Sequence, residues 1–107
     1  MVRQLALGQS AIVDDVIVDN QAMLWHEIAS QFSARLFFVE CICSDAAVHR
    51  ARIEGRTRGI PGWHEVGWTH VERMRAEMPR LTADRLTVDA MQPVEDNIRR
   101  VVDYISA

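Results

Sequence analysis

The arginines between residues 49 and 59 are the side chains best suited to chemistry. The segment reads HRARIEGRTRG, with Arg52 and Arg56 four residues apart on one predicted helix face and Arg58 where the helix gives way to a loop. Guanidinium groups bind phosphate through paired hydrogen bonds and stabilise charge on a phosphoryl group in transfer. Arginines near a helix C-terminus also interact favourably with the helix dipole. The alternative is therefore that these arginines form a solvated helix face without a ligand. The basic, flexible tail RTRGIPG favours a lid over an anion.

Two adjacent carboxylates form the second candidate site. Asp14 and Asp15 end the apolar run SAIVDD, residues 10–15, which is predicted to be a buried strand. The carboxyl end of a parallel strand is where open α/β sheets bind their ligands. There a carboxylate can hold Mg²⁺ or its water shell, or accept a proton from an attacking hydroxyl. The alternative is that one aspartate caps the following turn.

The stretch GWHEVGWT, residues 62–69, has the spacing of a phosphate-binding loop but lacks its chemistry. Trp68 stands where G-x-x-x-x-G-K-[ST] requires lysine, and all 12 basic residues of the chain are arginine. The stretch also follows RTRGIP, which is not a strand, whereas a phosphate loop joins a strand to a helix. Thr69 with Glu72 instead predicts a helix-capping box.

Strands and helices alternate in the predicted order of elements, which indicates a parallel sheet in one α/β domain. A first helix ends at Gly8. The predicted strands are 10–15, 36–43 and 85–89, and the further helices are 20–33, 46–57 (capped by Ser44 or Asp45), 69–78 and 93–105.

Several other side chains are given structural roles. The last helix is expected to turn one apolar face inward, made of Val94, Ile98, Val101, Val102 and Ile105. Asp89 is expected to end or cap structure. Cys41 and Cys43 lie two apart on one side of a strand and are interpreted as free thiols in a small core.

Composition limits the class of protein. The chain of 107 residues is enough for one small domain, and its net charge of −3 favours neither nucleic acid nor a membrane surface as a partner. No apolar run approaches the roughly 18 residues of a membrane span, and the N-terminus has no signal pattern. The cytoplasm is the expected compartment.

Four stretches together resemble the later part of P-loop small-molecule kinases, namely GQSAIVDDV, LFFVECICSD, VHRARIEGRTRGIPGW and LTVDAMQPVEDNI. The group they are most similar to is the AAA-type ATP-binding proteins of the zeta-toxin and chloramphenicol phosphotransferase kind. The resemblance implies an incomplete three-layer parallel sheet of about three strands, with a lid at about 50–68. It implies that Arg52, Arg56 and Arg58 bind ATP phosphates, and that Asp14, with Asp15 beside it, lies near Mg²⁺ and the acceptor hydroxyl. The implied reaction is transfer of the γ-phosphoryl group of ATP to a small molecule.

The resemblance does not extend to the first part of those kinases, which carries the phosphate loop and part of the acceptor site. A single incomplete domain spanning 1–107 is therefore expected, and it is expected to be inactive by itself. The alternative is a non-catalytic α/β fragment that associates with itself or with a partner chain through exposed strand edges.

Overall fold

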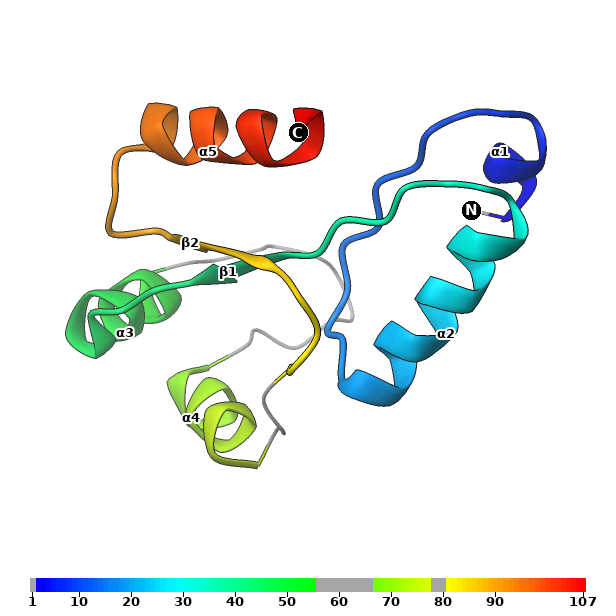
Figure 1. Cartoon of the computed structure of the whole chain (residues 1–107). Coiled ribbons are helices and arrows are strands. Elements are labelled where there is room, and N and C mark those ends of the chain that lie inside the picture. The colour runs from blue at the N-terminus through cyan, green and yellow to red at the C-terminus, as the bar shows by residue number, and fades with distance from the viewer. Residues whose placement is uncertain (1, 56–66, 78–80) are drawn as a thin grey trace. The chain divides into compact units, whose positions relative to one another are not determined.

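The computed structural model describes residues 2–55, 67–77 and 81–107, and within them the chain is a mixed α/β protein (Figure 1). Its helices and strands are α1 (Val2–Ala6), α2 (Asp19–Gln31), β1 (Val39–Ile42), α3 (Ala46–Glu54), α4 (Trp68–Glu77), β2 (Leu86–Asp89) and α5 (Val94–Ser106). None of the helices in these ranges is both long and apolar enough to cross a membrane.

The chain divides into two compact units. The first unit combines residues 1–38 with 79–85, and the second combines residues 39–78 with 86–107. The second unit holds both strands and the helices α3, α4 and α5.

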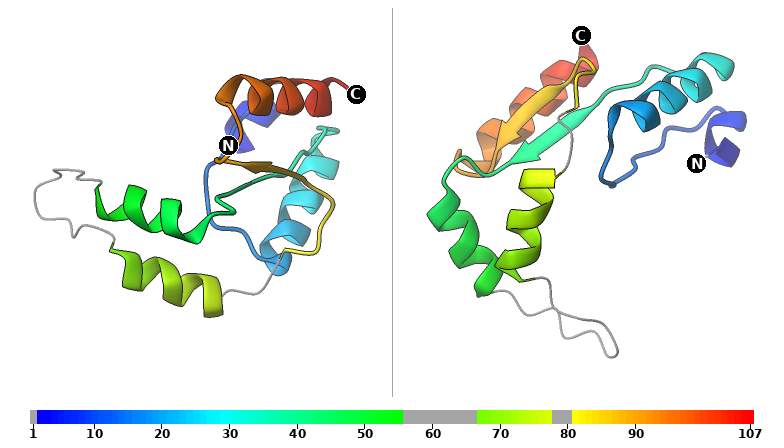
Figure 2. Two further views of the ribbon diagram at one scale, coloured as in Figure 1. Left: turned by 90° about the vertical axis from the view of Figure 1, so that its left-hand side faces the viewer. Right: turned by 90° about the horizontal axis from the view of Figure 1, so that it is seen from below.

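A two-stranded parallel sheet forms the centre of the second unit. β1 and β2 pair from Val39 with Leu86 to Ile42 with Asp89, so both strands end at the same edge of the sheet. α5 lies on one face of this sheet and α3 and α4 on the other, as the perpendicular views agree (Figures 1 and 2). Val88 in β2 is buried, with 7% of its surface exposed. The parallel pairing of these two strands confirms the prediction made from the alternating order of elements.

The first unit contains the helices α1 and α2, and the C-terminal ends of both are capped by the same hydrogen-bond pattern. After α2, Ser33 takes a left-handed φ of 53°, and the Ala34 N–H donates to the Ala29 carbonyl at 2.8 Å. After α1, Gly8 takes a φ of 73°, and the Gln9 N–H donates to the Gln4 carbonyl at 2.8 Å. These are Schellman motifs, which satisfy carbonyls at a helix C-terminus. The predicted glycine cap at Gly8 is confirmed.

Asp19, the first residue of α2, connects that helix to the segment 81–85 within the same unit. Its carboxylate accepts hydrogen bonds from the Thr82 backbone N–H at 2.7 Å and from the Thr82 hydroxyl at 2.8 Å. These two bonds, the backbone one first, lower the pKa of Asp19 below its ordinary value. The side chain at the start of the helix therefore joins two stretches that are far apart in sequence.

The predicted strand at 10–15 is wrong. Residues 9–18 form neither strand nor helix, and Ile12 is fully exposed, at 100% of its reference surface. A strand requires a neighbour for its backbone N–H and C=O groups, and apolar β-branched residues alone do not supply one. The described residues therefore contain two strands where about three were expected.

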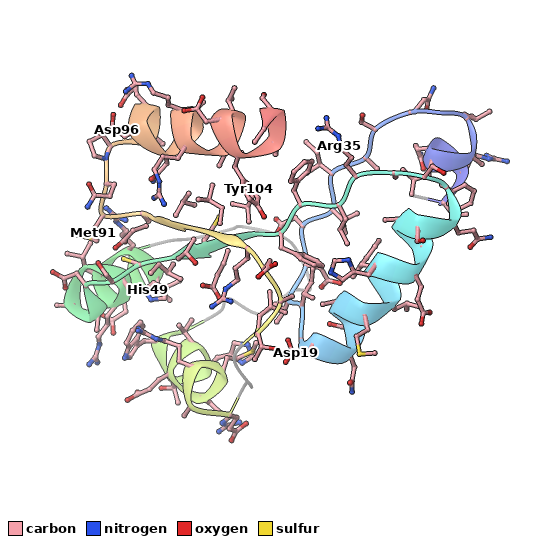
Figure 3. The ribbon with its side chains drawn as sticks, viewed as in Figure 1. Asp19, Arg35, His49, Met91, Asp96 and Tyr104 are labelled. Carbon is pink, nitrogen blue, oxygen red and sulfur yellow. The ribbon has the colours of Figure 1, made fainter. Side chains whose placement is uncertain are left out.

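The prediction for the last helix is correct in its bounds but wrong about its inward face. α5 begins after Pro93, as expected, yet four of the five residues predicted to point inward are exposed by 40–65%. These four are Val94, Ile98, Val102 and Ile105. Asn97, Val101 and Tyr104 are the half-buried residues of the helix, and Tyr104 lies on its sheet side (Figure 3).

Two smaller predictions also need correction. α4 begins at Trp68, and the Val71 N–H donates to the Gly67 carbonyl at 3.3 Å, so Thr69 lies inside the first turn and is not the cap. Cys41 is exposed and Cys43 is half-buried, so Cys41 is not a core residue, although both are free thiols as expected.

Candidate functional site

The carboxyl ends of the two strands are joined by one side chain, that of Asp89. Its Oδ1 accepts hydrogen bonds from the Ser44 N–H at 3.1 Å and the Met91 N–H at 3.0 Å. The Ala90 N–H donates to the Ile42 carbonyl at 2.7 Å and so extends the pairing past β2. Asp89 therefore fixes the loops that leave both strands, which confirms its predicted structural role.

The backbone of Asp89 holds the start of the next helix as well. The Asn97 side-chain amide donates to the Asp89 carbonyl at 2.8 Å. One residue thus connects β1, β2 and α5. Such a connection keeps the edge of the sheet in a fixed shape, which a binding site at that edge requires.

The N-terminus of α3, which follows β1, is capped by the chain itself. Asp45 accepts hydrogen bonds from the Ala47 N–H at 3.0 Å and the Val48 N–H at 3.1 Å, as the sequence predicts. Backbone amides at this position in other α/β proteins bind phosphate. Here a carboxylate already occupies them, so an anion at this edge of the sheet would have to be held by side chains.

An open hollow of about 420 Å³ lies at this edge of the second unit. It is lined by residues of β1, of α3, of α4 and of the segments that follow the two strands, namely Cys41, Ile42, Cys43, His49, Arg52, Arg75 and Ala90. Its position agrees with the rule that ligands of open α/β sheets bind beyond the carboxyl ends of the strands. Its volume lies within the usual range for small-molecule sites.

Two arginines give the hollow a positive charge. Arg52 comes from α3 and Arg75 from α4, and the Arg52 Nη1 donates to the Ala90 carbonyl at 3.3 Å. That bond orients the guanidinium group, which carries five N–H donors in all. Arg50 differs, because its Nε donates to the Glu54 carboxylate at 2.8 Å on the exposed side of α3. The hydrogen bond and charge of Glu54 raise the pKa of Arg50 above its ordinary value.

His49 adds an imidazole ring to the lining. Its ring meets Trp68 edge to face, with centroids 5.2 Å apart and planes at 86°, and Figure 3 shows it on α3. Its Nδ1 is buried and has no hydrogen-bond partner within the described ranges. Because this nitrogen has almost no accessible surface, a ligand in the open hollow would meet other atoms of the ring.

The residues predicted as functional fall into three groups. Arg52 lines the hollow, in the second unit. Asp14 and Asp15 belong to the first unit, where both are exposed, and the Asp15 Oδ1 accepts a hydrogen bond from the neighbouring Val16 N–H at 2.8 Å. Their expected position at the end of a strand is wrong, because no strand precedes them. Arg56 and Arg58, with most of the predicted lid, lie outside the described residues.

The sequence prediction missed Arg75 and His49 as parts of a site. Arg75 lies four residues after Val71, which places it near the apolar side of α4. A charged residue at such a position was the signal in the sequence that could have indicated a site. His49 has no spacing that marks a site. Both enter the hollow through the packing of α3 against α4, which periodicity does not predict.

The residues that the structure describes provide no preformed metal site. Nowhere in those ranges do three His, Cys, Asp or Glu side chains gather closely enough to hold an ion. Asp14 and Asp15 are ligand types that suit Mg²⁺, but a Mg²⁺ ion bound by one or two carboxylates draws its other oxygens from water and substrate phosphates.

Comparison with known proteins adds no relatives. No protein-family model matches the chain, and no curated protein or solved structure matches it significantly.

Proposed function

We propose that this chain binds the phosphate groups of a nucleotide, ATP in the first place, in the hollow at the carboxyl ends of β1 and β2. The observation that carries the proposal is the convergence of Arg52 and Arg75 on that hollow. Two guanidinium groups from different helices can hold a polyphosphate from two sides, and each such charge-assisted bond is strong. The His49 ring lines the same hollow.

The wider proposal is that the chain is the C-terminal portion of a P-loop small-molecule kinase, as the sequence resemblance implies. Arg52, Arg56 and Arg58 would then form the lid on the ATP phosphates. In the reaction, the bond between the γ-phosphorus and the bridging oxygen breaks, and a bond to the acceptor oxygen forms. The acceptor proton passes to a carboxylate base. Mg²⁺ would arrive with ATP, since a nucleotide brings its metal with its phosphates.

This chain by itself is proposed to bind ATP without transferring phosphate. It contains no lysine to place on the β- and γ-phosphates, and Asp45 occupies backbone amides at the start of α3. Turnover of ATP above background by the pure chain, abolished by Arg52→Ala, would contradict this part of the proposal.

The test is calorimetric titration of the folded chain with ATP and Mg²⁺. Arg52→Ala and Arg75→Ala should each weaken binding by about tenfold or more, because each removes charge-assisted bonds worth about 1.5–3 kcal/mol. Arg50→Ala and Arg73→Ala are matched controls on the same two helices, because neither side chain lines the hollow. Both should change binding by less than about twofold.

Two results would overturn the binding proposal. One is the absence of heat from a chain that circular dichroism shows to be folded. The other is an equal loss in the Arg50→Ala and Arg52→Ala variants, which would indicate a general effect of charge. Titration with inorganic triphosphate tests whether the affinity for ATP comes from its phosphates or from the rest of the nucleotide. If triphosphate competes with ATP, the hollow binds the phosphates.

A second candidate function is association through the sheet edges, and the two-stranded sheet favours it. Among the described residues, β1 and β2 each have a neighbour on one side only. Unpaired strand edges accept strands from other chains, and two-stranded sheets are only marginally stable alone. Protection of both outer strand edges from hydrogen exchange in concentrated but not in dilute protein would support this function.

A further inference from the structure

The hollow at the carboxyl ends of the strands contains two thiols beside its two guanidinium groups. Cys41, Cys43, Arg52 and Arg75 all line it, and Cys41 is exposed. We propose that Cys41 is a modification site, which forms a mixed disulfide with a small thiol that carries carboxylates, such as glutathione. The inference goes beyond the proposed function, because the modification itself does not require that the chain binds ATP.

The structure distinguishes the two thiols of the hollow. Cys43 is half-buried, and its Sγ donates a hydrogen bond to the Asp45 carbonyl at 3.6 Å. Oxidation of Cys43 would remove this donor from the residue that caps α3. Exposure is one of the properties that decide which thiols react. Cys41 is therefore the thiol that is modified, and Cys43 is its matched control.

The two thiols are too far apart to form a disulfide with each other. Cys41 lies in β1, and Cys43 directly follows the end of that strand at Ile42. Residues two apart along a strand are separated by roughly 6.6 Å, whereas the Cβ atoms of a disulfide lie about 3.5–4.5 Å apart. Cys43 thus does not displace a thiol bound to Cys41. The mixed disulfide persists until an external thiol reduces it.

The reaction is an exchange between a thiol and a disulfide. The proton of the Cys41 thiol passes to water, and the thiolate attacks one sulfur of glutathione disulfide. A bond forms between these two sulfurs, and the S–S bond of glutathione disulfide breaks. The departing glutathione thiolate takes up a proton. Cys41 is thereby oxidised to the level of a disulfide, and one half of glutathione disulfide is reduced to a thiol.

The two arginines determine which disulfide the hollow favours. Guanidinium groups bind carboxylates through paired N–H donors, so Arg52 and Arg75 attract an acidic disulfide to Cys41. The bond from the Arg52 Nη1 to the Ala90 carbonyl, 3.3 Å long, orients one of these groups. The volume of the hollow, about 420 Å³, lies in the range of small-molecule sites and suits a tripeptide thiol.

A mixed disulfide at Cys41 would place carboxylates against the arginines that are proposed to bind the phosphates of ATP. This consequence alone rests on the proposed function. The modified chain should bind ATP about tenfold or more weakly, and reductant should restore the affinity. Because mass spectrometry measures the modification and calorimetry measures ATP binding, failure of one proposal is distinguishable from failure of the other.

The test is the reaction of the full, folded chain with glutathione disulfide, followed by intact-protein mass spectrometry. One glutathione should be added to the wild type and to Cys43→Ser, and reductant should remove it. Cys41→Ser should react at least about tenfold more slowly, because its thiol is the half-buried one. Fragment spectra of the tryptic peptide 36–50 locate the modified sulfur in the wild type as well. A folded chain that stays unmodified, or one modified at Cys43 in place of Cys41, would overturn the proposal.

The charge of the reagent tests the part played by the arginines. The rate with glutathione disulfide is compared with that of neutral hydroxyethyl disulfide, each divided by the rate of the same reagent with a free cysteine peptide. The wild type should favour the acidic reagent by about threefold or more, because two exposed charge pairs contribute. Arg52→Gln and Arg75→Gln should each reduce this preference, whereas the controls Arg50→Gln and Arg73→Gln should keep it.

Two outcomes of this comparison would overturn the selection of an acidic thiol. One is a wild-type chain that shows no preference for the acidic reagent, a result that needs no variant to fold. The other is an equal loss of preference in folded Arg50→Gln and Arg52→Gln, which would assign the effect to the overall charge of the chain.

Discussion

At the residue scale, Asp89 makes the hydrogen bonds that connect the segments at the carboxyl edge of the sheet. Hydrogen bonds from the Ser44 side chain, then from the Met91 and Ser44 backbone N–H groups, lower the pKa of this carboxyl. The donors point at the carboxylate oxygens and therefore stabilise the ionised form. The folded pKa is thus below the unfolded value of about 3.9. The stability that Asp89 supplies is complete above the unfolded pKa and is lost as the pH falls through the folded pKa.

We therefore expect Asp89→Asn to destabilise the second unit at neutral pH and to flatten its loss of stability below about pH 4. Urea denaturation from pH 2 to pH 7, followed by circular dichroism, measures both effects. Asp103→Asn, which removes an exposed carboxylate from α5, is the control and should leave the pH dependence as in the wild type. An Asp89→Asn variant with the acid transition of the wild type would contradict the role given to Asp89.

The sequence predicted local roles of single residues well and non-local ones poorly. Asp45 was expected to cap a helix, and it does so through N–H groups two and three residues ahead. Such bonds depend on neighbouring residues only, so their signal is in the local sequence. Asp14 and Asp15 were placed at a strand end, which depends on a partner strand elsewhere. Arg75 reaches the hollow through the packing of one helix on another, which no local pattern records.

At the element scale, the end of α2 contains a strained position that a substitution can relieve. Ser33 has a φ of 53°, a conformation that costs an L-residue about 1 kcal/mol and glycine almost nothing. Ser33→Gly should stabilise α2 by roughly 0.5–1 kcal/mol, because the motif is kept and the strain removed. Hydrogen exchange of the α2 amides measures this change locally.

Gly8 after α1 is the matched control, because it occupies the same place in the same motif with a φ of 73°. Gly8→Ala should have the opposite sign and destabilise α1 by about 1 kcal/mol. Slower exchange in α1 for Gly8→Ala, or faster exchange in α2 for Ser33→Gly, would show that the backbone conformation does not control these helix ends.

The bounds of elements were more predictable than their surroundings. The helix after Pro93 and the strand that ends at Asp89 lie where the sequence placed them. The apolar periodicity of α5 correctly indicated an amphipathic helix, but it did not indicate what covers the apolar face. The sheet is only two strands wide in the described residues. It covers Val101 and Tyr104, while the other apolar residues of the helix stay exposed.

At the scale of the whole molecule, the net charge opposes the binding of ATP. The chain has a net charge of −3, so it repels ATP except where arginines gather. Affinity for ATP must then come from Arg52 and Arg75 acting locally. Such attraction falls with ionic strength, since the screening length drops from about 14 Å at 0.05 M salt to about 4 Å at 0.5 M.

We therefore expect salt to weaken the binding of ATP. Between about 0.05 and 0.5 M sodium chloride, ATP should bind about tenfold more weakly. Calorimetric titration at several salt concentrations measures this change. The residual ATP binding of Arg52→Ala should depend less on salt than that of the wild type, because one charge fewer takes part. An affinity for ATP that does not change with salt would contradict the binding of its phosphates by Arg52 and Arg75.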